Sequence, residues 1–341
     1  MKGDPQKILI IRLSSIGDIL LTSPLIRLLR RRFPSAEIDY CVKERYAELL
    51  TPHPYLRRLL TLRRDGRWAM FRLRRQIKAE NYSLVVDVHR NLRSLLLRDG
   101  RAHTVTYPKF RWKRWLLVRL GINRYNGIYP VYQRYLSGLT RWQIQDDGLG
   151  LDFFLTDEEK EFSRTWLANQ QLGAETRRIG FAIGAGHATK RWPIEYFMDL
   201  ARLLQARSPV KIFLFGGKQD QPAAAEIVKA LGSLAVDLCG QFSLRRSAAL
   251  LAEMDLMVAN DTGLMHLAIA LKVKTVAIFG CTTAELGFFP VASFSRVVQH
   301  SHLSCRPCSH VGWPHCPRIH FRCMREIAPK QVEAAARSLL S

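Results

Sequence analysis

The segment Asn260–Ala268 joins an apolar strand-like run to an apolar helix pattern through a short polar turn. The first N–H groups of such a helix have no intrahelical partner, and the helix dipole favours negative charge there. Thr262 can cap the helix, and Gly263 lets an anion approach the backbone. Asp261 adds a carboxylate, which suits a ligand with both phosphate and hydroxyl groups, such as a nucleotide sugar. The alternative is an ordinary strand-to-helix connection with a good cap.

A second such turn, Gly184–Pro193, combines glycines with Thr189, Lys190 and Arg191. The glycines expose backbone N–H groups, and a lysine ammonium is a point charge suited to phosphate. A basic residue in a glycine-rich loop is often simply solvated. The second half of the chain is nearly balanced in charge, which favours the phosphate-binding interpretation for Lys190.

Two further turns carry a carboxylate. Gly17 and Asp18 connect the first predicted strand to a helix, and Asp18 is a candidate general base. An acidic residue at a helix start can equally be a partner of the helix dipole. Gly216 and Gly217 precede Asp220, and this turn could admit a ribose or the edge of a base.

Strand-like and helix-like segments alternate along the chain, which predicts an α/β fold with parallel sheets. The expected strands are 7–12, 37–42, 84–88, 179–183, 211–215, 256–259 and 275–279. The expected helices are 18–32, 194–205, 222–231, 244–253 and 264–271, with another beginning after the cap Thr156. Periodicity breaks over 137–152, so we expect two Rossmann-like domains. In open parallel sheets, ligands bind at the carboxyl ends of the strands, where all four polar turns fall.

Charge is concentrated in the first half of the chain. The 341 residues carry a formal charge of +23, and residues 1–150 hold 30 basic against 12 acidic side chains. Segments 63–78 and 107–120 interleave cations with aromatic residues, which suits an interfacial membrane anchor, single-stranded nucleic acid or a solvated basic face. The sequence has no signal peptide and no long apolar run, so we expect a cytoplasmic protein.

Four of the seven cysteines crowd near the end of the chain, at Cys305, Cys308, Cys316 and Cys323. Their spacing resembles a four-thiolate site, and metal is a better expectation than disulfides in a cytosolic protein. We therefore expect a structural zinc or iron there, with reduced thiols or an adventitious disulfide as alternatives.

The motifs together resemble glycosyltransferase family 9, the lipopolysaccharide core heptosyltransferases, which have the GT-B fold. The matching stretches are Ser-Ile-Gly-Asp18, Lys190-Arg-Trp-Pro, Asp261-Thr-Gly-Leu-Met-His266-Leu-Ala and Cys323-Met324, in the family's order. The resemblance implies an acceptor-binding domain over 1–155 and a donor-binding domain over 156–325. The latter contains the cysteine-rich segment 305–323, and a C-terminal helix follows over 326–341.

The resemblance further implies an inverting, metal-independent transfer of heptose from ADP-heptose to the inner core of lipopolysaccharide. Asp18 would deprotonate the acceptor, and Lys190 would act in catalysis by meeting the donor diphosphate. The other implied donor-binding residues are Thr189, Asp220, Asp261, Thr262, Gly263 and His266, although His266 could merely pack. The implied location is the cytoplasmic face of the inner membrane, held peripherally by an anionic surface. The alternatives are a GT-B transferase for another nucleotide sugar and a non-enzymatic nucleic-acid-binding protein; no nucleic acid is expected as a partner, because no known nucleic-acid motif is present.

Overall fold

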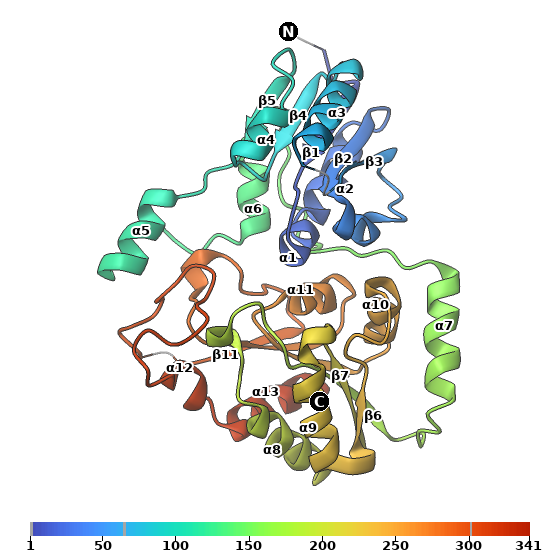
Figure 1. The fold of residues 1–341 in the computed structure, drawn as a ribbon, viewed down its shortest axis with the longest axis vertical. Helices are drawn as coiled ribbons and strands as arrows, with labels where there is room; N and C mark the ends of the chain where they lie inside the picture. The colour runs from blue at the N-terminus through green and yellow to red at the C-terminus, as the bar shows by residue number, and fades with distance from the viewer. Residues whose placement is uncertain (1–2, 64–65, 301) are drawn as a thin grey trace. The chain divides into compact units, whose positions relative to one another are not determined.

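The computed structural model describes residues 3–63, 66–300 and 302–341, and the chain divides into two compact units. The first unit comprises Met1–Lys109 and Val131–Phe154, and the second comprises Phe110–Pro130 and Leu155–Ser341. The segment Phe110–Pro130, which includes part of the basic, aromatic run at 107–120, therefore packs with the second unit. Figure 1 shows the elements of both units.

The first unit is built on a parallel sheet of five strands in the order β3-β2-β1-β4-β5. Its strands are β1 (Lys7–Ile11), β2 (Glu37–Lys43), β3 (Arg58–Leu62), β4 (Leu84–Asp87) and β5 (His103–Thr106). Its helices are α1 (Ile16–Leu20), α2 (Ser23–Arg32), η1 (Glu44–Leu50), α3 (Gly66–Ala79), α4 (Leu92–Leu97), α6 (Val131–Leu136) and η2 (Ser137–Trp142). Because the strands are parallel, their carboxyl ends share one edge of the sheet.

A single helix was expected over 18–32, but α1 and α2 are separate helices. The hydroxyls of Thr22 and Ser23 donate to the carbonyls of Ile19 and Leu20, at 2.6 and 2.8 Å. Pro24 has no N–H to continue an intrahelical ladder and would clash with the preceding turn. The break leaves α1 as a short helix that carries Asp18, while α2 buries its apolar face in the core.

The second unit holds a parallel sheet of six strands in the order β11-β10-β9-β6-β7-β8. Its strands are β6 (Arg177–Ala182), β7 (Val210–Phe215), β8 (Ala235–Asp237), β9 (Leu256–Asn260), β10 (Thr275–Phe279) and β11 (Ser295–Gln299). Its α-helices are α5 (Arg111–Leu120), α7 (Asp157–Ala168), α8 (Ile194–Gln205), α9 (Gln221–Leu231), α10 (Leu244–Ala252), α11 (Gly263–Ala270), α12 (Arg322–Arg325) and α13 (Pro329–Leu340). Short 3₁₀ turns are η3 (Ala188–Lys190), η4 (Lys218–Asp220), η5 (Gly232–Leu234) and η6 (Ala284–Leu286). Two parallel sheets confirm the expected α/β class.

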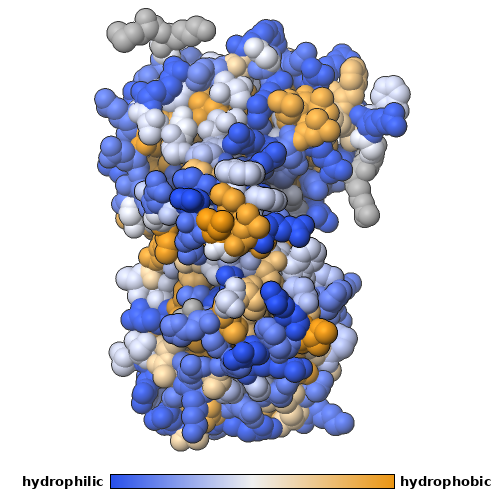
Figure 2. Space-filling view, turned by 90° about the vertical axis from the view of Figure 1, so that its left-hand side faces the viewer, coloured by the Kyte–Doolittle hydropathy of each residue, from blue (hydrophilic) through white to orange (hydrophobic). Residues whose placement is uncertain are grey.

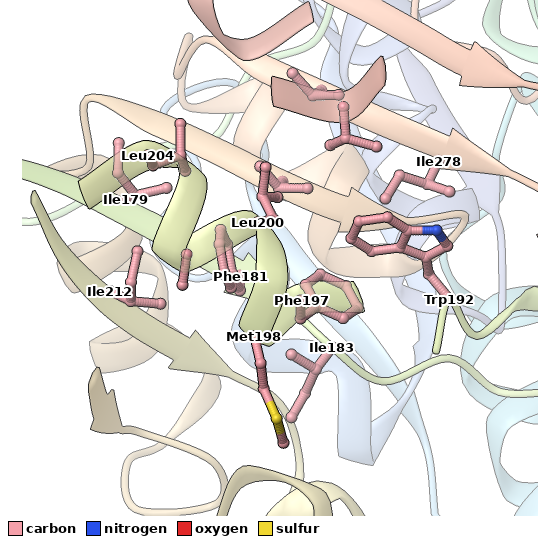
Figure 3. Close-up of a cluster of buried hydrophobic side chains, with 14 of the residues drawn as sticks. Ile179, Phe181, Ile183, Trp192, Phe197, Met198, Leu200, Leu204, Ile212 and Ile278 are labelled. Carbon is pink, nitrogen blue, oxygen red and sulfur yellow. The ribbon is translucent and has the colours of Figure 1, made fainter. Parts of the chain in front are cut away.

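Helices α8, α9 and α13 pack together over the sheet of the second unit (Figure 1). The core beneath them contains Trp192 and Phe197, whose ring centroids lie 4.9 Å apart in an edge-to-face arrangement (Figure 3). Trp192 is 1% exposed, and its indole N–H donates to the Ile327 carbonyl at 2.9 Å. Trp192, two residues after Lys190, thus anchors the turn that carries Lys190 in the hydrophobic core.

The surface seen in Figure 2 is largely hydrophilic, with separate groups of hydrophobic residues between the charged ones. Large apolar side chains that are exposed include Trp68 and Phe71 on α3, and Trp112 and Trp115 on α5. Within the described ranges, every helix is too short or too polar to cross a membrane.

Candidate functional site

Asp18 lies in the third position of α1, directly after the carboxyl end of β1. Its carboxylate receives three contacts from its own turn. The backbone N–H and hydroxyl of Ser15 donate to Oδ2 at 3.2 and 3.0 Å, and Arg12 Nη2 pairs with Oδ1 at 2.5 Å. The Asp18 side chain remains 21% exposed, so it is held in place and still reachable from solvent.

Arg12 is the residue that fixes this arrangement. Its guanidinium is nearly buried and donates to the carbonyl of Ser14 at 2.8 Å and to that of Val88 at 2.6 Å. Burial raises the pKa of Asp18, but the charge of Arg12 and the hydrogen bonds from Ser15 outweigh it, and the net pKa is lowered. Asp18 is therefore a carboxylate at physiological pH, the form that a general base requires.

On the second unit, three residues from three strand ends form one polar cluster. Lys190, in the turn after β6, places Nζ 2.7 Å from Oδ2 of Asp261, which follows β9. Thr282, in the loop after β10, donates its hydroxyl to the same oxygen at 2.8 Å. The structure thus brings together Lys190 and Asp261, two of the residues predicted to bind the donor, and adds Thr282. The Lys190 side chain is 14% exposed and that of Asp261 is 6% exposed.

The N-terminus of α11 lies directly after Asp261. Thr262 is its N-cap, with extended backbone, and its hydroxyl accepts from Leu264 N–H at 3.2 Å. Thr262 and Gly263 are both partly exposed. His266 is buried one turn further along, with its ring 6.4 Å from that of Phe288 in an edge-to-face arrangement. A capped helix N-terminus beside a lysine can bind a phosphate group.

Asn260 joins this turn to the turn that carries Lys190. Its side-chain oxygen accepts from Trp192 N–H at 3.0 Å, and its amide nitrogen donates to the Ile183 carbonyl at 2.9 Å. The Asn260 side chain is fully buried. The two strand-end turns are therefore held by one amide, which sets the position of Lys190 relative to α11.

Thr189 and Asp220 are engaged within the protein. The Thr189 hydroxyl accepts from Trp313 N–H at 2.7 Å and donates to the Trp313 carbonyl at 3.1 Å, so it ties segment 305–323 to the Lys190 turn. The buried Asp220 carboxylate accepts from Gly217 N–H at 2.9 Å. Gly184 packs so closely on Asp220 that an added Cβ would lie 2.3 Å from its Oδ1. These contacts show how both side chains shape the turns around the polar cluster.

The four cysteines expected to bind zinc or iron do not surround a common point in the described part of the chain. Among the residues that the structure describes, no group of three or more His, Cys, Asp or Glu side chains is placed to hold a metal ion. Cys323 is packed into the hydrophobic core on α12. Cys308 instead hydrogen-bonds Cys281, a contact that lowers the pKa of the Cys281 thiol. A structural zinc or iron held by Cys305, Cys308, Cys316 and Cys323 therefore stays a prediction, because the described thiols are not arranged around one common point.

Sequence reasoning did not assign roles to Thr282 or Arg306. Thr282 had a usable signal, since it follows a predicted strand just as the other site residues do. Arg306 had none. Its guanidinium donates to the carbonyls of Gly280 at 2.5 Å and Thr282 at 2.8 Å, and also to that of His300. Arg306 thereby holds the loop that presents Thr282 to Asp261.

The family model for glycosyltransferase family 9 (heptosyltransferase) matches residues 70–314. The chain belongs to glycosyltransferase family 9. This family 9 enzyme is 29% identical over 320 residues to lipopolysaccharide heptosyltransferase 1 of Pseudomonas aeruginosa, covering 89% of this chain and 86% of the relative. It is 31% identical to lipooligosaccharide heptosyltransferase 2 of Haemophilus ducreyi, with 82% and 84% covered.

Solved structures confirm that the family 9 chain has the fold of GT-B heptosyltransferases. A family 9 glycosyltransferase from Veillonella parvula superposes with a TM-score of 0.81 at 24% identity, covering 100% of this chain and 98% of the other. The E. coli heptosyltransferase WaaC, solved with ADP-2-deoxy-2-fluoro heptose, gives a TM-score of 0.65 at 20% identity, covering 97% and 99%. The resemblance inferred from four short motifs thus extends over nearly the whole chain.

Proposed function

We propose that this family 9 glycosyltransferase moves heptose from ADP-heptose to the inner core of lipopolysaccharide, with inversion at the transferred carbon. In this proposal the first unit, predicted as 1–155, binds the acceptor, and the second binds the donor. The names of the relatives and the heptose analogue bound to WaaC support the choice of sugar, donor and acceptor.

The observation that carries the proposal is the cluster of Lys190, Asp261 and Thr282 beside the N-terminus of α11. Lys190 and the N–H groups at Thr262 and Gly263 would bind the diphosphate and stabilise the charge that develops as ADP leaves. Asp261 would accept hydrogen bonds from sugar hydroxyls. His266, Thr189 and Asp220 are proposed to complete the donor site, with Thr189 and Asp220 acting through the shape of their turns.

The proposed base is Asp18, and the proposed reaction is a direct displacement. The Asp18 carboxylate takes the proton from an acceptor hydroxyl as that oxygen attacks the anomeric carbon, and the bond to the ADP phosphate breaks. A carboxylate held by Arg12 is a weak base. We therefore expect proton transfer to accompany bond formation to the sugar rather than to precede it. A positioned base contributes about 10²–10⁴ in rate.

A panel of nucleotide sugars assayed against truncated core acceptors tests this proposal. We expect transfer from ADP-heptose to a heptose-deficient inner core, and a product of inverted configuration. Transfer from a different nucleotide sugar alone would identify a GT-B transferase with another donor. Salt-dependent binding to RNA with no affinity for ADP would favour the nucleic-acid alternative instead.

We also propose that the protein attaches peripherally to the anionic cytoplasmic face of the inner membrane. On α3, Trp68 is 76% exposed and Phe71 is 59% exposed, and Arg67, Arg72 and Arg74 lie on the same helix. Basic residues near an anionic leaflet contribute about 1 kcal/mol each, and aromatic rings enter the headgroup region. Sedimentation with phosphatidylglycerol vesicles should deplete the protein, and phosphatidylcholine vesicles should not. Equal recovery from both would contradict the attachment.

A further inference from the structure

The strand order of the first sheet reverses between β1 and β4. In the order β3-β2-β1-β4-β5, strands β2 and β3 extend to one side of β1, and β4 and β5 extend to the other. In open parallel sheets, ligands bind outside the carboxyl ends of the strands at such a switch point. Asp18 follows the carboxyl end of β1, and His89 follows that of β4. Arg12 joins the two segments, because it pairs with Asp18 and donates to the Val88 carbonyl at 2.6 Å.

The turn that carries His89 is held by the buried carboxylate of Asp87. Asp87 Oδ1 accepts from the N–H groups of His89 and Arg90, at 2.9 and 2.7 Å. Its Oδ2 accepts from the Ser94 hydroxyl at 2.9 Å, and Lys109 Nζ donates to the His89 carbonyl at 2.7 Å. Arg90 has a φ of 51°, and such strain at a non-glycine residue persists only where surrounding contacts hold it. The backbone of His89 is therefore fixed in position.

The hydrogen-bond network assigns the proton of the His89 ring to Nδ1. Asn91 Oδ1 accepts from Ser94 N–H at 2.9 Å, which fixes the orientation of the Asn91 amide. The amide nitrogen of Asn91 therefore faces His89 Nε2, at 2.7 Å, and donates to it. Burial and the charges of Arg12 and Lys109 lower the pKa of His89 to about 4, so the ring is neutral at physiological pH. A neutral imidazole that accepts at Nε2 carries its hydrogen on Nδ1.

This Nδ1–H group is a buried donor that the fold does not use. Within the described part of the chain, no group accepts a hydrogen bond from His89 Nδ1. Nearly all buried polar groups in native proteins are paired, so an unpaired donor indicates a role outside the fold itself. The charge of Asp18 acts on the His89 ring and opposes the fall in its pKa, which places the two side chains near each other.

We infer that His89 is an acceptor-binding residue whose Nδ1–H donates to an uncharged oxygen of the acceptor sugar, beside the hydroxyl that Asp18 deprotonates. The inference rests on the proposed glycosyl transfer and names the contact that orients the acceptor. Neighbouring oxygens of a sugar are close together, so one can accept from His89 while the other donates to Asp18. A cation in place of His89 would lower the pKa of Asp18 further and weaken it as a base. A neutral N–H positions the sugar without that effect.

Two substitutions separate the roles of the two ring nitrogens. The amide in His89→Asn reaches the position of Nδ1 and keeps a donor there, whereas the amide in His89→Gln reaches that of Nε2 and keeps the contact with Asn91. We expect kcat/KM for an O-deacylated, heptose-deficient core glycolipid to fall about threefold to tenfold in His89→Gln, the effect of one neutral hydrogen bond, and to fall less in His89→Asn. Affinity for ADP should be the same in both. His103→Gln, at the amino end of β5 and so at the opposite edge of the sheet, is the matched control and should change neither quantity.

NMR of the full chain with isotope-labelled histidine supplies a readout that does not depend on turnover. The His89 signal, assigned by its loss in His89→Asn, should have the ring nitrogen shifts of an imidazole protonated at Nδ1. It should move when the glycolipid is added and stay in place when ADP alone is added.

Three outcomes would overturn the inference. A greater loss of kcat/KM in His89→Asn than in His89→Gln would show that His89 acts only through Asn91. A His89 signal that stays in place while the glycolipid binds would remove the contact and leave the transferase proposal standing. A parent protein that binds no glycolipid would overturn both the contact and the acceptor proposed for the enzyme.

Discussion

The ion pair between Lys190 and Asp261 supports a test that separates structural from donor-binding roles. The two side chains are 14% and 6% exposed, and Thr282 is the other described partner of Asp261 Oδ2. Removing one partner of a buried pair costs about 3–5 kcal/mol, because the remaining charge is left uncompensated. The cluster keeps some access to solvent, and the Thr282 hydroxyl still donates to Asp261. We therefore expect Lys190→Met to lose about 3 kcal/mol of unfolding free energy, the lower end of that range. Urea denaturation measures this loss.

The double variant Lys190→Met/Asp261→Asn leaves no buried charge behind. Its loss should therefore be smaller than the sum of the single losses, by about 1–3 kcal/mol. Calorimetry with ADP supplies the second readout. Lys190→Met should weaken ADP binding at least tenfold, the equivalent of about 1.4 kcal/mol. Asp261→Asn should bind ADP at least as tightly as the parent, because a carboxylate near a diphosphate is repulsive, and yet should transfer sugar more slowly.

Strictly additive losses of stability, together with an unchanged ADP dissociation constant in Lys190→Met, would contradict both the structural and the donor-binding role of the ion pair. Additive losses alone would show that the pair is not coupled in solution. An unchanged ADP affinity alone would remove Lys190 from the donor site while leaving its structural role in place.

Three further predictions concern other parts of the site. Asp18→Asn should lower kcat by about 10²–10⁴ with ADP affinity preserved, and turnover at the parent rate would show that Asp18 is not the base. Arg12→Met should move the acidic limb of the kcat/KM profile to higher pH. The carboxylate is the active form, so activity is lost as pH falls through its pKa; Arg12 holds that pKa low, and burial alone would raise it. Arg12→Lys, which keeps the charge, should shift the limb less, and identical profiles for all three proteins would contradict the assignment. Arg306→Lys keeps the charge but loses the planar fork that donates to several carbonyls. Arg306→Lys should lower kcat by more than its loss of unfolding free energy would explain. A loss of kcat in proportion to the loss of stability would make Arg306 only a stabilising residue.

The central strands were predictable from sequence, and the edge strands were not. The strands β1, β2, β4, β6, β7, β9 and β10 were all expected, within one or two residues at their ends. The strands missed, β3, β5, β8 and β11, are the outermost strands of the two sheets. A central parallel strand is covered on both faces and reads as a continuous apolar run. An edge strand such as β5 or β8 is short and partly exposed, so its sequence lacks that signal.

In the site, too, the residues marked by a local sequence pattern were predictable, and those whose role depends on distant segments were not. Lys190, Asp261 and Asp18 were proposed from the sequence because each lies in a polar connection that follows an apolar run, with glycine close by. The roles of Arg12 and Arg306 depend on carbonyl groups that come from other strands and loops, and no local pattern records such contacts. The four cysteines show that a local pattern does not by itself fix the geometry of a site. Their spacing is a local pattern, but whether the thiols meet depends on where the core places Cys323.

The amide of Asn260 limits how the loop between β6 and α8 can be exchanged for that of a relative. Because it accepts from Trp192 N–H and donates to the Ile183 carbonyl, the two ends of the loop between β6 and α8 are fastened to the end of β9. If this loop alone were exchanged for that of a relative, the new loop would have to fit an Asn260 side chain positioned for the old one. Chimeras should therefore transplant the 184–192 loop together with the 260–263 turn as a single cassette.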